Sequence, residues 1–236
     1  MKKFFNALIV AAMLSVLSTG CTKDRETISK NVNVQGNIKG IVIDGSWQVN
    51  VFQDDNCSAT IDYSAFLEGK IVAEVRSDGY LYLKCSKNGN IRRDDLVATV
   101  SLTNLELIDM SSAAEITLNG NYLGDKLKIN MENASEIKKL NYTGNSVEIG
   151  ISDAARCTIS GEVQSASISG SGASSFYMLN TSTSDLNINL SSASNAEITI
   201  NGIVTGKLKS ASTLKYQGIA DVSSLKLEGG SKVKKL

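Results

Sequence analysis

The feature that most constrains the fold of this chain is a unit of about 20 residues that recurs through its C-terminal half. Within each unit, hydrophobic residues alternate with polar ones, and a small residue follows at the position where we expect the chain to turn a corner. A unit this short holds two or three strands and cannot bury its own apolar face, so the copies must stack. The corner residues are Ala113, Ala134, Ala154, Ala173, Ala193, Ala211 and Gly230, at intervals of 21, 20, 19, 20, 18 and 19 residues.

Stacked units of this kind pair in parallel at about 4.8 Å, and their inward residues form one continuous core. The repeat therefore predicts an all-β fold, a parallel β-helix over residues 105–236. A leucine-rich repeat would need a Leu-x-x-Leu-x-Leu skeleton that is absent, and a β-sandwich would not require equal spacing. Ala134 and Ala154 are expected to point into a crowded corner. One slot, five residues before the corner, is expected to stack inside the helix and holds Ile129, Ile149, Ile168 and Ile188.

Residues 31–104 have a different pattern of alternating strands without the repeat. Ser77-Asp78-Gly79, between Val75 and Tyr80, is a strong hairpin signal. We expect an antiparallel or mixed sheet that leads into the β-helix and caps its open end. Trp47, the only tryptophan, alternates with Val49 and Val51 and is expected to be buried at this junction, although it is also a candidate for binding. Lys232, Lys234 and Lys235 are expected on the last rung, where edge lysines discourage end-to-end stacking.

The first 20 residues are typical of a signal peptide and are excluded from the fold. Lys2 and Lys3 precede the apolar run "FFNALIVAAMLSVL", which ends at Gly20-Cys21. A small residue before cysteine resembles a bacterial lipoprotein signal, although Leu17 lies one position farther from Cys21 than usual. We therefore predict lipidation of Cys21 and a tether over residues 21–30; an ordinary secretory signal is the alternative. "KDRE" resembles the acidic export signal of Bacteroidetes surface lipoproteins.

Composition excludes several classes of function. The chain has 24 Lys and Arg, 24 Asp and Glu, and no histidine or proline. A net charge of zero argues against a nucleic-acid partner. Without histidine there is no Ser-His-Asp or Cys-His arrangement and no His-ligated metal. Cys57, Cys85 and Cys157 remain after the signal; Cys57 and Cys85 could pair, but their places near opposite ends of neighbouring strands favour free thiols. Cys157 is expected in the core.

The order of features also resembles a known family. "GIVIDGSWQVNVFQ" is followed by "DGYLYLKCS", by the small-residue corners, and by "LKYQGIADVSSLKLEGGSKVKKL". This order is similar to the head GIN domain family of auto-transporter adhesins, common in Bacteroidetes lipoproteins, over residues 31–236. The family's glycine-rich corner appears here as Gly172-Ala173-Ser174 and Gly229-Gly230-Ser231. The resemblance implies a right-handed parallel β-helix and a surface role, and it supplies no catalytic residues or cofactor.

Besides Trp47, two groups of side chains are candidates for ligand binding. The first is an outward ladder of Asn130, Ser169 and Asn189 beside Lys128, Glu148, Ser167 and Asn187, which suits hydrogen bonds to sugars or proteins but is also an ordinary polar exterior. The second is Tyr122 and Tyr142, 20 residues apart, which should stack on adjacent rungs as a sugar platform or as cover for a loop. We expect Lys128 to form a minor ion pair with Glu148.

The rival function is a polysaccharide lyase or hydrolase, which would need paired carboxylates or an acidic ladder. Among the residues before each corner only Asp153 is acidic, and Asp54-Asp55 and Asp94-Asp95 are expected to be solvated turns. We therefore expect a non-catalytic lipoprotein of the outer membrane, facing the surface or the periplasm, that binds a glycan or a surface protein and uses no metal or cofactor. A structural envelope protein without a dedicated ligand is a third possibility.

Overall fold

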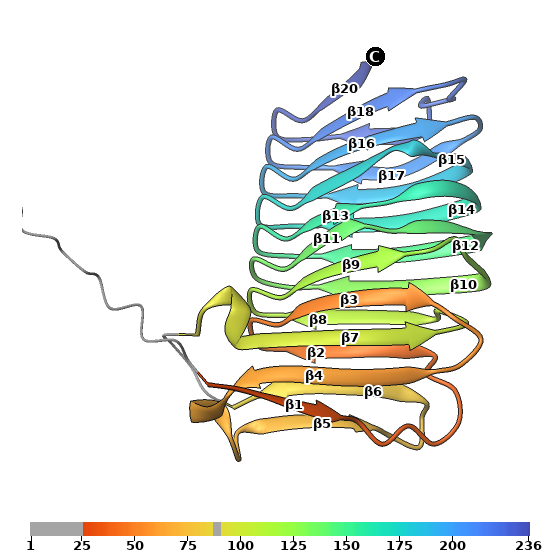
Figure 1. The fold of residues 1–236 in the computed structure, drawn as a ribbon. Helices are drawn as coiled ribbons and strands as arrows, with labels where there is room; N and C mark the ends of the chain where they lie inside the picture. The colour runs from red at the N-terminus through yellow and green to blue at the C-terminus, as the bar shows by residue number, and fades with distance from the viewer. Residues whose placement is uncertain (1–25, 87–90) are drawn as a thin grey trace, which may run out of the picture.

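The computed structural model describes residues 26–86 and 91–236 and confirms the predicted parallel β-helix. Its strands stack in rungs, each of which crosses one layer, turns a tight corner and returns through a second layer, as Figure 1 shows. In chain order, the strands of layer 1, which precede the corners, are β2 (Gly40–Asp44), β6 (Tyr80–Cys85), β8 (Leu107–Ser111), β10 (Tyr122–Met131), β12 (Asn141–Ile151), β14 (Ser160–Gly170), the second part of β15 (Ser175–Leu190), β17 (Val204–Leu208) and β19 (Leu225–Leu227).

Layer 2 holds the strands that follow the corners, and it is paired in parallel in the same way. The alternation of each strand sends one set of side chains into the space between the layers and the other set into solvent. The strands of layer 2 are β3 (Gln48–Gln53), β7 (Leu96–Leu102), β9 (Glu115–Asn119), β11 (Glu136–Lys139), β13 (Arg156–Thr158), the first part of β15, β16 (Asn195–Ile200), β18 (Thr213–Gln217) and β20 (Lys232–Lys235).

The core is a set of stacked side-chain columns between the two layers. The predicted slot is confirmed: Ile129 pairs with Ile149, Ile149 with Ile168, and Ile168 with Ile188, and all four are buried. Layer 2 contributes a facing column in which Cys157, Phe176 and Ala196 are register partners. Burial of the Cys157 side chain raises the pKa of its thiol, so Cys157 serves as a small apolar residue, as predicted.

The corners differ from the prediction in the direction of their side chains. Ala134 and Ala154 are exposed, and so are the corner residues of the other units. At Ala154 the reason is the backbone, since Asp153 and Ala154 both have positive φ, 55° and 68°, as in a type I′ turn. The residue after each corner points inward instead and is buried in most units; these residues are Ala114, Ser135, Ala155, Ser174, Ser194, Ser212 and the half-buried Ser231.

Hydrogen bonds hold each corner and join it to the next. In three corners the inward serine hydroxyl donates to the carbonyl three residues earlier, as in Ser194 to Ser191 at 2.7 Å and Ser212 to Lys209 at 2.6 Å. The backbone N–H of the corner residue donates to the neighbouring rung at Ala154, Ala173, Ala193 and Ala211, for example from Ala193 to the Ser210 carbonyl at 2.9 Å. The corners therefore continue the parallel ladder instead of interrupting it.

The N-terminal region is a mixed sheet, which agrees with the prediction of an antiparallel or mixed sheet. The strand β4 (Ser58–Ser64) pairs antiparallel with β7 and with β1 (Thr27–Asn31), and β5 (Ile71–Val75) forms the predicted hairpin with β6. β1 begins inside the segment predicted as a tether. β2, β3, β6 and β7 pair in parallel and already belong to the β-helix, so residue 104 marks no change of sheet.

The rungs of this region are stacked out of chain order. β2 lies between β6 and β8, and β3 lies between β7 and β9. In chain order the β2–β3 rung comes first, and the β6–β7 rung that follows lies on the side of it that faces the cap. The chain then passes to the other side of the β2–β3 rung, where β8 and β9 form the next rung. Trp47 takes the inward position just after the first corner and is fully buried, as expected.

Two short 3-10 helices lie in the cap: η1 (Ala65–Leu67) and η2 (Arg93–Asp95). Asp95 is buried and accepts hydrogen bonds from the Ser64 hydroxyl at 2.6 Å and from the Arg92 backbone N–H at 2.6 Å. The expectation of a solvated Asp94-Asp95 pair is therefore wrong for Asp95, because this carboxylate joins η2 to the end of β4. Cys57, Cys85 and Cys157 are free thiols.

Candidate functional site

The outer face of layer 1 carries the predicted polar ladder in register. Asn130, Gly150, Ser169 and Asn189 are successive partners across four strands, and Asp109 precedes them on β8. Asn130 Nδ2 lies 3.5 Å from Asp109 Oδ2, and Asn189 Nδ2 donates to Asn187 Oδ1 at 3.1 Å. An open groove of about 530 Å³ follows this row. The amides and hydroxyls of the row are thus presented at a regular spacing of about 4.8 Å.

A second groove, of about 420 Å³, follows the neighbouring row of the ladder, Glu148, Ser167 and Asn187. The predicted pair of Lys128 with Glu148 is present at 3.9 Å, but Lys126 approaches the same carboxylate more closely, at 2.9 Å. The hydrogen bond from Lys126 lowers the pKa of Glu148 below its usual value. Glu148 is therefore an ionised, paired carboxylate and is unsuited to donate a proton.

A third groove, of about 530 Å³, continues the second one towards the cap and shares Lys126 with it. Its wall contains Tyr80 from β6 and the apolar side chains of Leu105 and Leu123, of which Leu123 is 63% exposed. The outer face of layer 1 therefore offers polar groups over its middle rungs and aromatic and apolar surface at its cap end.

Tyr122 and Tyr142 are register partners on β10 and β12, so the predicted stacking on adjacent rungs is confirmed. Both side chains are fully buried, however, and neither ring can act as a sugar platform in this structure. Gly124 and Gly144 explain the burial, since a Cβ at these positions would lie 3.1 and 2.6 Å from the Tyr142 hydroxyl. The two glycines leave room for a tyrosine side chain inside the bend of the rung. Burial also raises the pKa of Tyr122 to about 12.

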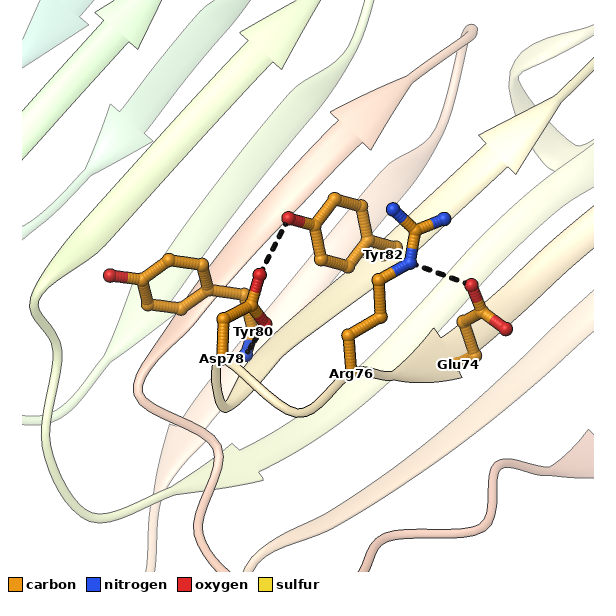
Figure 2. Close-up of polar contacts among 5 residues, drawn as sticks. All are labelled: Glu74, Arg76, Asp78, Tyr80 and Tyr82. Carbon is orange, nitrogen blue, oxygen red and sulfur yellow. Dashed lines mark hydrogen bonds and ion pairs between the residues drawn. The ribbon is translucent and has the colours of Figure 1, made fainter.

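A second pair of tyrosines, Tyr80 and Tyr82, lies on the outward side of β6 and was not predicted from the sequence. Figure 2 shows both side chains beside the β5–β6 hairpin, with their hydroxyls on the same side. Tyr82 lies on the row of Asp109 and Asn130, because Val42 pairs with both Tyr82 and Asp109. The alternation of tyrosine with leucine in "DGYLYLKC" indicates that both tyrosines lie on one side of the strand. Deciding which side of this strand faced solvent required the register.

Layer 2 has a smaller groove on its outer face. About 360 Å³ lies beside Tyr177, which is 44% exposed, with Leu179, Asn180 and Glu197 in its wall. The Glu197 carboxylate is paired with Lys215 at 2.8 Å. This groove is separate from the ladder because it opens on the opposite layer.

The described carboxylates do not gather into a metal site. Within residues 26–86 and 91–236, no three Asp, Glu, Cys or His side chains lie close enough to hold a metal ion. Asp153 is exposed at its corner, and Asp54 accepts the backbone N–H of Asn56 in a loop. Cys21, the predicted lipidation site, lies outside the described residues, and no described helix has the length and apolarity needed to span a membrane.

Comparison with known proteins decides the family. A family model described as "Putative auto-transporter adhesin, head GIN domain" matches residues 37–220, most of the chain. The chain belongs to the head GIN domain family. The match begins after β1, ends before β19 and includes both rows of the GIN domain ladder. None of the curated proteins compared with the chain matches it.

Three crystal structures share the GIN domain fold at 15% sequence identity. A "putative adhesin" of Bacteroides fragilis superposes with a TM-score of 0.75 over 89% of this chain and 97% of that one. A "putative adhesin" of Parabacteroides merdae gives 0.69 over 90% and 97%, and a "putative lipid binding protein" of Parabacteroides distasonis gives 0.70 over 91% and 98%. At this identity the similarity establishes the fold alone.

Proposed function

We propose that this GIN domain protein is a non-catalytic adhesin that binds glycan chains along the outer face of layer 1. The observation that carries the proposal is the alignment of three grooves on that one face, two of them along the rows of the ladder. From Tyr82 to Asn189 the row crosses six strand spacings, or about 29 Å. A surface of this length suits a linear polymer better than a small ligand.

The chemistry of the face favours binding over cleavage. Glycoside hydrolysis needs one carboxyl group with a raised pKa, to act as the acid, near a second carboxylate. Glu148, in the middle of the second groove, has its pKa shifted in the opposite direction by Lys126. The Asn, Ser and Thr side chains that line the same groove hydrogen-bond sugar hydroxyls without doing acid or base chemistry.

We further propose that the domain is anchored in the outer membrane through a lipid on Cys21, facing the surface or the periplasm. The support is the signal sequence that ends at Gly20-Cys21 and the family's description as an adhesin. This placement would hold a rigid β-helix outside the bilayer.

A glycan array probed with the purified protein tests the proposed function. We expect binding to polysaccharides without release of reducing ends or unsaturated products. The double variant Asn130→Ala, Asn189→Ala should weaken binding, because it removes two amides from one row. If the protein cleaves any bound polysaccharide, or if the double variant binds as well as the unaltered protein, the proposed function is wrong.

A further inference from the structure

We propose that Tyr80 is a sugar-stacking platform at the cap end of the layer 1 grooves, and that the ligand class is a neutral, linear glycan. This inference rests on the proposed function and deepens it. A pyranose ring presents apolar C–H groups on its faces, which pack on aromatic rings, while its hydroxyls need polar partners. The third groove offers both kinds of surface side by side.

The position of Tyr80 is created by a glycine on the neighbouring strand. Gly40 pairs with Tyr80 on one side and with Leu107 on the other. A Cβ at Gly40 would lie 3.0 Å from Tyr80 Cδ1 and 2.7 Å from the Leu107 carbonyl oxygen. Gly40 therefore leaves the space in which the Tyr80 ring lies against β2, and the ring remains partly exposed in the wall of the groove.

The hairpin holds this arrangement rigidly. Asp78 accepts the Tyr80 backbone N–H at 2.9 Å through one carboxylate oxygen and the Tyr82 hydroxyl at 2.8 Å through the other. Arg76 stacks on the Tyr82 ring, with Cζ 3.9 Å from the ring centroid, and its Nε donates to Glu74 at 2.7 Å, as Figure 2 shows. One face of the Tyr82 ring is thus covered by Arg76, and Tyr80 is the ring that lies in the wall of the third groove. A rigid aromatic side chain loses little conformational entropy when a ligand binds.

The charges near this site decide between a neutral and an acidic glycan. Arg76 is paired with Glu74, and Lys126 with Glu148. Asp78 and Lys84 add one charge of each sign, so the hairpin has no cationic excess that would attract a polyanion.

Calorimetric titration of the purified protein tests the inference. The probes are hexasaccharides of β-1,4-linked glucose and β-1,4-linked mannose, with the hexamer of galacturonic acid as the acidic counterpart, each at low and high salt. We expect binding of at least one neutral hexamer with an affinity that salt leaves unchanged. Tyr80→Ala should weaken it roughly tenfold, and Tyr80→Phe should retain affinity within about twofold, because the ring is kept.

Tyr177→Ala is the matched control, because it removes another partly exposed tyrosine from the opposite layer and should leave affinity unchanged. Denaturation midpoints of all variants establish that they are folded, and Tyr80→Phe covers the case in which Tyr80→Ala unfolds the hairpin. If Tyr80→Ala binds with full affinity while the Asn130 and Asn189 double variant does not bind, Tyr80 is not a stacking platform. The proposed function of the grooves would still stand in that case. Salt-sensitive preference for the acidic hexamer would refute the ligand class. Failure of every polysaccharide and hexamer to bind would overturn both proposals.

Discussion

Replacing a corner alanine by glycine should stabilise this protein, although alanine is usually the more stabilising of the two residues. Ala154 and Ala193 are exposed and have φ of 68° and 60°. An L-residue in the left-handed region costs roughly 1–2 kcal/mol, and glycine removes that cost. Glycine also has more conformational freedom in the unfolded chain, which lowers the gain in the free energy of unfolding by roughly 0.4–1 kcal/mol. The expected gain is therefore about 0.5–1 kcal/mol in the free energy of unfolding for each corner.

The double variant Ala154→Gly, Ala193→Gly provides a larger signal. These corners are two rungs apart, about 9.6 Å, so their effects should add to about 1–2 kcal/mol. Ala196→Gly is the contrast, because Ala196 is fully buried in β16 and its loss should cost about 1.5 kcal/mol through lost methyl burial and a more flexible strand. Urea denaturation measures the free energy of unfolding of each of these variants, and we expect their m-values to be unchanged. A loss of stability in the corner variants would show that their methyl groups pack in the core, against the geometry described above.

Three further predictions concern burial, anchoring and alkaline pH. Ile149→Asp should cost several kcal/mol by placing a carboxylate between Ile129 and Ile168, whereas Asn189→Asp should change stability by less than about 1 kcal/mol; equal effects in chemical denaturation would contradict the register. Cys21→Ser should abolish membrane attachment, and a variant that still incorporates labelled fatty acid would exclude Cys21 as the acylated residue. The pKa of Tyr122 is raised to about 12, so its stabilising contribution should be complete below pH 10 and lost as the pH rises towards 12. Tyr122→Phe should remove that loss from the pH dependence of unfolding, and an unchanged profile would assign it to another group.

Periodic features were predictable from the sequence because they depend on spacing alone. The Ile129, Ile149, Ile168 and Ile188 column follows from a repeat near 20 residues, and the β5–β6 hairpin follows from Ser77-Asp78-Gly79. Both rest on rules that act locally, namely strand alternation and turn chemistry. The polar ladder also followed, since it occupies the positions between the inward residues.

The orientation of the corners was harder to predict, because a small residue suits either a crowded interior or a left-handed backbone. The preceding residue gave a partial signal, since Asn133, Asp153 and Gly172 are types that tolerate positive φ, whereas serine precedes the remaining corner alanines. The burial of Tyr142 depended on two glycines, 124 and 144, whose importance appears only when the rungs are aligned. The position of the Tyr80 ring likewise depended on Gly40, which is 40 residues away in the chain.

The out-of-order stacking of the first rungs has a consequence for how the protein folds. Contacts between later rungs join residues about 20 positions apart, whereas β2 meets β8 across 67 residues, from Asp44 to Ser111. Closing that long loop costs more entropy than closing one later rung, so we expect formation of the β2–β8 contacts to be the slow step of folding. Once the β2–β3 rung is enclosed on both sides, each later rung adds to an existing template at low contact order. Folding would then proceed as slow nucleation followed by rapid growth towards the C-terminus.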